Sequence, residues 1–234
     1  MCTVTLSHRD DGFILTSNRD EAIARGTLPP RQYVEDQVRL LYPRDQEAGG
    51  TWIGVSDRNR VICLLNGGFE PHKRQPPYRQ SRGLVVKDLL KASDFILAAE
   101  RYDYQGIEPF TCVIVDCPGA EINSYELVWD GARSHFKKLD KGSNIWSSSL
   151  LYSQEVRKDR EERFRRFKSQ KELTAENLLN FHASKGSEKN EGLIIDRGFL
   201  KTRSITQVLH LDGKLTMYYQ DLLEEGPPHL LSFT

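Results

Sequence analysis

Short polar turns between strand-like segments constrain the fold of this chain more than any other feature of its sequence. The turn Arg9-Asp10-Asp11-Gly12 separates segment 2–8, where Val4 and Leu6 alternate with polar residues, from the strand-like segment 13–17. Further turns of this kind are Asp57-Arg58-Asn59-Arg60, Asp130-Gly131 and Asp212-Gly213. Strands joined by so few residues pair in antiparallel fashion. The sequence therefore predicts sheets that are mostly antiparallel.

Apolar residues at helical spacing interrupt this pattern in two places. The first place covers 85–92 and 95–102, and the second covers 151–167 and a short helix at 175–182 that Thr174 caps. The resulting order is strands, helices, strands, helices, strands, which predicts an α+β fold of two stacked sheets covered by helices. Charges of both signs in the 151–167 helix are typical of a solvated face rather than of a nucleic-acid-binding stripe.

Two segments without a regular pattern are predicted to be loops. Segment 18–32 is polar and contains Pro29-Pro30, and segment 66–82 contains Gly67-Gly68 and Pro76-Pro77. No linker or internal repeat divides the chain, so we expect a single domain spanning 1–234.

The charge balance and the lack of long apolar runs argue against several classes of protein. Lys and Arg together number 33, as do Asp and Glu, so the formal net charge is zero, whereas a general nucleic-acid-binding protein normally has a basic surplus. No apolar run approaches the ~18 residues of a membrane-spanning helix, and the N-terminus becomes polar too early for a signal peptide. We therefore expect no nucleic-acid partner, no integral membrane segment and a cytoplasmic location.

The cysteines and histidines show no metal-binding or disulfide pattern. Cys63, Cys112 and Cys117 are expected to be buried apolar residues, since the chain has no C-x-x-C pair. The six histidines are scattered without zinc-ligand spacing. The sequence therefore predicts no metal site.

The fourth cysteine, Cys2, directly follows the initiator methionine. Methionine is generally removed when the next side chain is small, which leaves Cys2 with both a thiol and a free α-amine. Their reference pKa values are about 8.5 and about 7.7–8.0, so a proton passes between them at little cost. An α-amine that serves as base for its own residue's nucleophile is an established form of covalent catalysis. If Met1 is retained, the amine is an amide and cannot act as base.

Four strongly polar residues, Asn18-Arg19-Asp20-Glu21, follow the second strand-like segment. If the first two segments form a hairpin, these residues lie near Cys2. A carboxylate can orient the amine there, and an arginine or asparagine can stabilise a developing oxyanion. The alternative is a solvated turn, in which an Arg-Asp pair contributes under about 1 kcal/mol. Spacing alone leaves both interpretations open.

Motifs distributed from the first residues to Thr206 carry a resemblance to a known family. They are Met1-Cys2, Asn18-Arg19-Asp20-Glu21, Gly49-Gly50-Thr51-Trp52-Ile53-Gly54-Val55, Leu65-Asn66, Ser81-Arg82-Gly83-Leu84 and Thr202-Arg203-Ser204-Ile205-Thr206. In this order they resemble the NRDE family, also called the Transport and Golgi organisation 2 family. That family is similar in turn to N-terminal-nucleophile hydrolases of the choloylglycine and penicillin V acylase type.

The resemblance implies a four-layer αββα sandwich and a catalytic site around Cys2. Cys2 is implied to be the nucleophile, and Asp20 to hold its amine. Asn66 matches an oxyanion-hole asparagine, and Arg203 matches a late arginine near the nucleophile. Such enzymes cleave linear amides through a thioester intermediate.

Two departures from the hydrolase pattern affect the candidate site. The hydrolases carry Arg-Asn-x-Asp where this chain reads Ser17-Asn18-Arg19-Asp20. Asn18 and Arg19 are retained among the candidate catalytic residues. An asparagine expected before the long helix has no match, and Ser148 is the nearest side chain there that can donate to an oxyanion.

Trp52 and a basic loop provide further candidate contacts to a substrate. Trp52 lines a pocket or, alternatively, packs in the core. Segment 72–82 contains basic residues but no acidic ones, so it binds an anionic group, with Arg79 as the candidate contact, or forms a solvated lid.

The leading hypothesis is a cysteine amidohydrolase that cleaves a linear non-peptide amide in a small acylated molecule and needs no cofactor. The alternative is a non-catalytic protein that binds or carries haem or an acyl lipid in the same cleft. A Cys2 thiolate can ligate haem iron, although the sequence offers no obvious second axial ligand. Both hypotheses predict a small-molecule ligand.

Overall fold

The computed structural model describes residues 3–119, 121–186 and 192–233. The chain forms two compact units, each of which contains one sheet and two helices. Unit 1 comprises Met1–Arg25, Gly142–Ser148 and Tyr152–Thr234, and unit 2 comprises Gly26–Lys141 and Ser149–Leu151.

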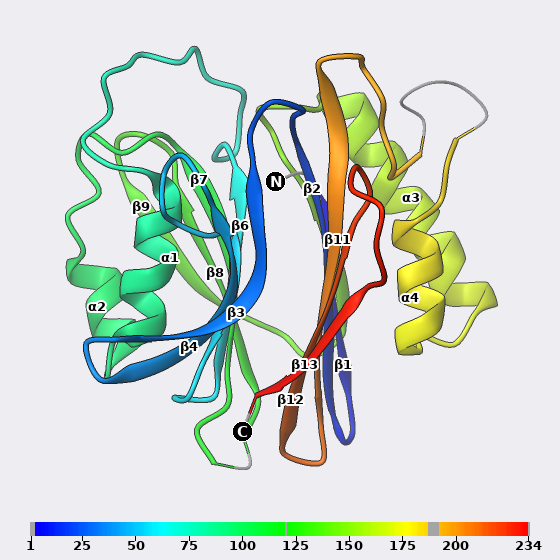
Figure 1. Cartoon of the computed structure of the whole chain (residues 1–234), viewed down its shortest axis with the longest axis horizontal. Coiled ribbons are helices and arrows are strands. Elements are labelled where there is room, and N and C mark those ends of the chain that lie inside the picture. Colours follow the sequence, from blue (N-terminus) through cyan, green and yellow to red (C-terminus); the bar gives the residue numbers. More distant parts are fainter. Residues whose placement is uncertain (1–2, 120, 187–191, 234) are drawn as a thin grey trace. The chain divides into compact units, whose positions relative to one another are not determined.

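Unit 1 is built on a six-stranded sheet whose neighbouring strands are all antiparallel. Its strands are β1 (Thr3–Arg9), β2 (Gly12–Ala22), β10 (Ser143–Ser147), β11 (Leu200–Leu211), β12 (Lys214–Asp221) and β13 (His229–Phe233), in the spatial order β10-β1-β2-β11-β12-β13. Helices α3 (Gln154–Gln170) and α4 (Ala175–His182) cover one face of this sheet (Figure 1). An apolar cluster joins the two layers, in which Ile14 of β2 packs with Phe164, Leu178 and Phe181 of the helices.

Outside this apolar cluster, polar side chains dominate the helix-covered face of the unit 1 sheet. The buried polar side chains there hydrogen-bond to other strands, to the helices or to the loops that flank the helices. They belong to Thr3, Thr5, Thr16, Asn18, Asp20 and Gln207. Buried polar groups are tolerated only when they have hydrogen-bond partners. The helical layer must therefore supply matching donors and acceptors.

Unit 2 is built on a seven-stranded antiparallel sheet in which each strand pairs with its neighbours in the chain. Its strands are β3 (Thr27–Glu35), β4 (Val38–Asp45), β5 (Ile53–Ser56), β6 (Arg60–Asn66), β7 (Phe110–Asp116), β8 (Asn123–Trp129) and β9 (Ser134–Leu139). Helices α1 (Arg82–Lys91) and α2 (Phe95–Arg101) lie on one face (Figure 1). Val85, Leu89 and Phe95 are buried against that face, as the apolar spacing predicts.

The predicted hairpins are confirmed, and their turns have the expected backbone geometry. Asn59 and Asp212 adopt positive φ angles of 54° and 49°, and Gly213 follows with 73°. Asn, Asp and Gly tolerate this left-handed region better than other residues do. The α+β class, with two antiparallel sheets covered by helices, is also confirmed.

The predicted loop at 18–32 is wrong for most of its length. β2 continues through Ala22, because buried partners satisfy the polar side chains of Asn18 and Asp20. β3 begins at Thr27 despite Pro29-Pro30, since it is an edge strand and its register shifts between Leu28 and Arg31.

The start of α3 and three strands also differ from the prediction. α3 begins at Gln154 rather than near Leu151, because the Ser153 side chain accepts from the backbone N–H of Val156 and caps the helix. β4, β10 and β13 lie outside the predicted strands, and β10 and β13 are short with mostly half-exposed or exposed residues.

Two motif glycines of unit 2, Gly50 and Gly83, pack backbone to backbone where α1 meets the segment before β5. A Cβ at Gly83 would lie 2.8 Å from both the N and O atoms of Thr51, and a Cβ at Gly50 would lie 2.7 Å from the carbonyl carbon of Gly83. The N–H of Thr51 donates to the carbonyl of Gly83 at 3.3 Å. Only glycine allows this approach of helix and strand.

We expect Gly83→Ala to lower the free energy of unfolding by about 1–3 kcal/mol, because backbone atoms cannot move aside for the new methyl group. Urea unfolding measures the change. Gly226→Ala is the matched control, since a Cβ there meets nothing within 4 Å, and it should be nearly neutral. Equal urea midpoints for the two variants would show that the close backbone packing at Gly83 does not require glycine.

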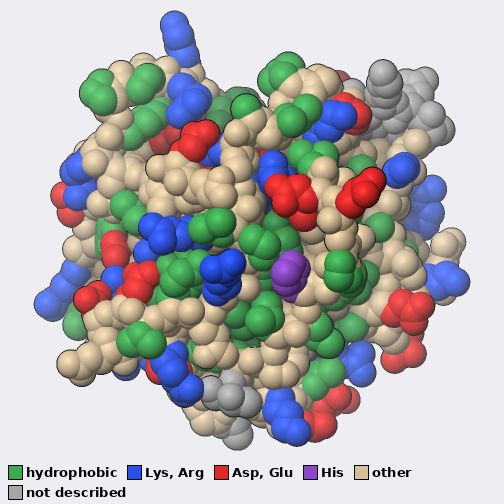
Figure 2. Space-filling view, viewed as in Figure 1, with side chains coloured by type: hydrophobic (Ala, Val, Ile, Leu, Met, Phe, Trp, Pro, Cys, Tyr) green, Lys and Arg blue, Asp and Glu red, His purple; other side chains and the backbone are tan. Residues whose placement is uncertain are grey.

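Charged side chains of both signs are interspersed on the face of the molecule that Figure 2 shows. No helix among the described residues is long and apolar enough to cross a membrane.

Candidate active site

The start of β1 reaches the first residue of the Asn18–Glu21 motif. Cys2 itself lies outside the described residues. The next residue, Thr3, pairs with Asn18 in the antiparallel register of β1 and β2. The predicted first hairpin therefore brings the beginning of β1 to the end of β2 that carries the motif.

Asp20 is buried in unit 1, and both of its carboxylate oxygens accept hydrogen bonds. The hydroxyl of Thr202 on β11 donates to Oδ1 at 2.6 Å, and the phenol of Tyr152 donates to Oδ2. Thr202 in turn accepts from the backbone N–H of Ile195 at 2.9 Å. Its hydroxyl lies much closer to Asp20 than to its other acceptor, the carbonyl of Leu193 at 3.5 Å. These contacts fix the orientation of the carboxylate and exclude the solvated-turn interpretation of Asp20.

Asn18 links β2 to the end of α4 and to the segment after it. Its amide nitrogen donates to the carbonyls of His182 and Leu193, at 3.0 and 2.8 Å, which uses both amide protons. Its Oδ1 lies 2.6 Å from Nδ1 of His182. The structure thus gives Asn18 a bridging position and leaves no amide proton for an oxyanion.

His182 is held as a neutral imidazole. Because Oδ1 of Asn18 only accepts, Nδ1 of His182 carries the proton and Nε2 accepts from the Thr5 hydroxyl at 2.8 Å. Complete burial, and then the positive charge of Arg160, lower the pKa of His182 to about 3. This histidine is therefore a fixed structural partner of Asn18 rather than a general base.

Arg19 and Arg203 both form ion pairs within unit 1. Arg19 is buried, and its Nη2 lies 3.5 Å from Oε2 of Glu21. Nη2 of Arg203 lies 2.7 Å from Oε1 of Glu224, and Nε lies 3.4 Å from Oδ2 of Asp221.

A β-bulge sets the position of Arg203 beside the Asp20 contacts. Thr202 pairs with Asp20, whereas Ser204 pairs with Arg19, so Arg203 is the extra residue between them. Bulges often re-aim side chains next to active sites. Arg203 and the Thr202–Asp20 contact therefore lie at the same end of the β2–β11 pair.

Ser148, Trp52 and Asn66 lie in different parts of the fold. Ser148 is buried in unit 1 and lies in the segment of the chain that connects β10 to α3. Trp52, just before β5, is also buried, and Asn66 is the last residue of β6, where it is half-buried; both belong to unit 2. Their proposed roles stay predictions.

The three other cysteines are buried free thiols, as predicted. Burial raises the pKa of Cys112, and burial together with the charge of Asp116 raises the pKa of Cys117 to about 12. These two thiols stay protonated at neutral pH and are poor nucleophiles.

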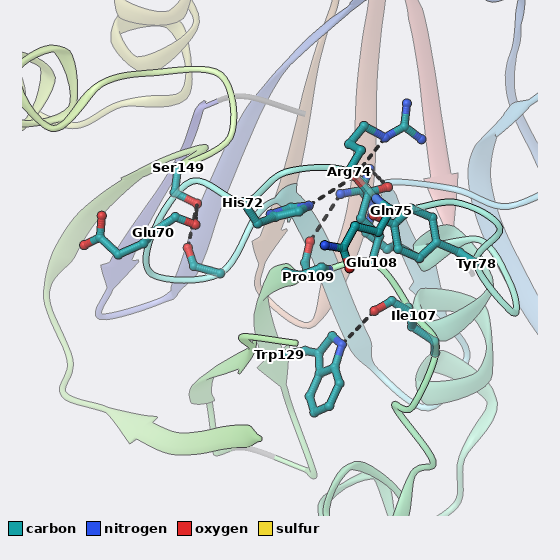
Figure 3. Close-up of polar contacts among 12 residues, drawn as sticks. Glu70, His72, Arg74, Gln75, Tyr78, Ile107, Glu108, Pro109, Trp129 and Ser149 are labelled. Carbon is teal, nitrogen blue, oxygen red and sulfur yellow. Dashed lines mark hydrogen bonds and ion pairs between the residues drawn. The ribbon is translucent and has the colours of Figure 1, made fainter. Parts of the chain in front are cut away.

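The basic loop between β6 and α1 is bound by groups of unit 2 itself. Figure 3 shows His72 and Arg74 directed at the carboxylate of Glu108, with N–O distances of 3.3 and 3.1 Å. Arg82 reaches the same buried carboxylate at 3.3 Å. The predicted substrate contact Arg79 is exposed and donates to the carbonyls of Asp103 and Gln105.

Among the residues that the structure describes, no group of three or more His, Cys, Asp or Glu side chains could hold a metal ion.

A comparison of the sequence with models of protein families identifies the family of the chain. The profile described as Transport and Golgi organisation 2 matches residues 1–218. The chain belongs to this family. No curated protein sequence matches it. In terms of the fold, the family motif Asn18–Glu21 lies at the end of β2, and the Thr202–Thr206 motif lies opposite it on β11.

Solved structures of N-terminal-nucleophile hydrolases share the fold of this family member. The Caenorhabditis elegans ortholog of N-acylethanolamine-hydrolyzing acid amidase has a TM-score of 0.60 at 10% identity, over 91% of this chain and 93% of that one. A mutant of conjugated bile acid hydrolase from Clostridium perfringens has a TM-score of 0.55 at 9% identity, over 99% and 92%. Penicillin V acylase from Agrobacterium tumefaciens has a TM-score of 0.53 at 10% identity, over 99% and 86%. At such identities the likeness shows the fold alone.

Two residues that hydrogen-bond to Asp20, Thr202 and Tyr152, are not among the candidates that the sequence of this family member suggests. Thr202 adjoins Arg203 within a recognised motif, so its position was a usable signal. Tyr152 has no such signal, because it lies 132 residues from Asp20 in the chain.

Proposed function

We propose that the protein is a cysteine amidohydrolase of the N-terminal-nucleophile type, which cleaves a linear non-peptide amide in a small acylated molecule. The observation that carries this proposal is the buried, doubly hydrogen-bonded carboxylate of Asp20 at the end of β2, on the strand that pairs with the start of β1. A fixed carboxylate at this place suits the task of holding a terminal amine. The fold shared with known amidases supports the same reaction class.

In the proposed reaction, removal of Met1 frees the amine of Cys2, and Asp20 orients it. The amine takes the thiol proton while sulfur attacks the carbonyl carbon of the amide. The C–N bond then breaks, the amine passes the proton to the leaving nitrogen, and a thioester remains on Cys2. Water cleaves the thioester, releases the acid and restores the thiol.

The remaining site residues have supporting roles in this proposal. Arg203 lies close to the Thr202–Asp20 pair and contributes positive charge, partly balanced by Asp221 and Glu224. Asn66 as oxyanion donor, Ser148 as a further donor, and the substrate contacts Trp52 and Arg79 are proposed from the family resemblance.

Trapping the acyl-enzyme tests the proposal. Intact-mass spectrometry should show loss of Met1 and the addition of one acyl group from an activated-ester reagent at Cys2. Cys2→Ala should abolish this labelling, whereas Cys117→Ser, which alters a buried thiol, should leave it unchanged.

Two results would contradict the proposal that the protein is a cysteine amidohydrolase. One is retention of Met1 in the purified protein, and the other is labelling that persists in Cys2→Ala. Haem binding by Cys2→Ala in an absorbance titration, together with an unlabelled wild type, would instead favour the binding or carrier protein.

A further inference from the structure

Arg160 of α3 is a buried cation for which the described residues provide no acidic partner. The residue is 1% exposed, and among the described residues no carboxylate lies within ion-pair distance of it. Its guanidinium donates to Oγ1 of Thr3 at 2.5 Å and to the carbonyl of Gly192 at 3.0 Å, while Nε has no hydrogen-bond partner in the described part of the chain. A buried charge is strongly unfavourable unless something nearby compensates it.

The aromatic ring of Tyr152 provides part of that compensation, and the guanidinium carbon of Arg197 lies farther from the same ring, at 5.3 Å. The guanidinium carbon of Arg160 lies 3.7 Å from the ring centroid, where the π face attracts a cation. The hydroxyl of the same ring donates to Oδ2 of Asp20. Cation, phenol and carboxylate therefore form one chain of contacts, with opposite charges at its two ends.

The charges at the two ends strengthen the hydrogen bond in the middle. A cation over the ring withdraws electron density from the phenol, which makes its hydroxyl a better donor. A bond to an ionised acceptor is shorter and stronger than a neutral one, and burial removes competing water. The Tyr152–Asp20 contact is thus stronger with Arg160 in place than without it.

Helix α3 fixes the geometry of this chain of contacts. Tyr152 lies just before the N-cap Ser153, and Arg160 lies about two turns further along the chain. With Thr202 holding Oδ1, Asp20 cannot rotate unless Tyr152 releases Oδ2. The start of α3, more than 130 residues along the chain from Asp20, therefore sets the direction of the Asp20 carboxylate on β2.

We propose that Tyr152 and Arg160 are positioning residues for Asp20: Tyr152 fixes the carboxylate through its hydroxyl, and Arg160 fixes Tyr152 through its ring. The inference rests on the proposed function, in which Asp20 orients the amine of Cys2. Neither residue is assigned a contact to the substrate.

The test measures the rate of Cys2 labelling at saturating reagent and the reagent concentration that gives half of that rate. We expect Tyr152→Phe, which removes only the hydroxyl, to lower the maximal rate at least about tenfold, because misplacement of a catalytic group affects the rate more than binding. The half-saturating concentration should stay unchanged. Arg160→Met should have a similar effect, and Arg160→Lys, which keeps a cation, should recover part of the rate.

Matched controls separate positioning from general loss of stability. Tyr104→Phe removes a buried hydroxyl that donates to the carbonyl of Ala99, and Arg60→Met removes a buried arginine stacked on Phe95. The Tyr104 hydroxyl bonds to Ala99, and the Arg60 guanidinium bonds to Asp116 and to backbone carbonyls of Leu89 and Ala92, so neither variant removes a contact to Asp20. Both variants should label at the wild-type rate while folded, as checked by circular dichroism.

The outcomes distinguish the two proposals. An unlabelled wild type overturns the proposed function, and this inference with it. A labelled wild type, with folded Tyr152→Phe labelling at the same rate, overturns the positioning role alone. Equal rates for Arg160→Lys and Arg160→Met overturn the role of the Arg160 charge.

Discussion

Replacing Asp20 by asparagine should slow the acylation of Cys2 at least about a hundredfold, the range found when one preorganised electrostatic partner is removed from an active site. The substitution removes the negative charge that holds the terminal amine. It also introduces an NH₂ group that faces either the Tyr152 or the Thr202 hydroxyl, which both donate to Asp20 in the wild type. The rate is measured by intact-mass spectrometry with the activated-ester reagent.

A second carboxylate provides the control for this substitution. Asp116 is largely buried and pairs with Arg60 at 2.7 Å in unit 2. Asp116→Asn also breaks a structural ion pair but leaves Asp20 intact, so it should label at the wild-type rate. Wild-type labelling by folded Asp20→Asn would remove Asp20 from the mechanism.

Acidification should destabilise the fold through His182. Its pKa is about 3 in the folded protein and about 6.5 in an unfolded chain, so between these values only the unfolded state gains a proton. The contribution to stability is therefore complete above pH 6.5 and decreases as the pH falls toward 3. At 1.36 kcal/mol per pH unit, it amounts to about 3 kcal/mol between pH 7 and pH 4.5.

Urea unfolding at these two pH values, compared between wild type and His182→Asn, isolates this contribution. The asparagine amide does not titrate, so the variant should be less stable at pH 7 but should lose about 3 kcal/mol less on acidification. His229→Asn, at an exposed position that starts β13, should behave as wild type. Parallel losses in wild type and His182→Asn would show that His182 does not stay neutral in the folded state.

Local sequence signals predicted the elements that local forces determine. The turn residues around Asn59 and Asp212 favour left-handed backbone, and the spacing of Val85 and Leu89 places an apolar stripe on one side of α1. Asn18 to Ala22 was predicted incorrectly, because polar residues resemble a loop until their buried partners are known. Those partners, His182 and Tyr152, come from distant parts of the chain.

The antiparallel hairpins, the helices, the family and the candidate residues Cys2, Asp20 and Arg203 could be predicted without coordinates. Turn chemistry, periodicity and motif order are properties of neighbouring residues or of their order along the chain. Three other contacts join residues far apart in the chain and are visible only in the folded protein: Asn18 bridges to α4, Glu108 binds the basic loop, and Arg160 lies over Tyr152. In the sequence Arg160 is one arginine among the mixed charges of α3. Its burial depends on the face that the helix turns toward the sheet, which the spacing of charged residues does not specify.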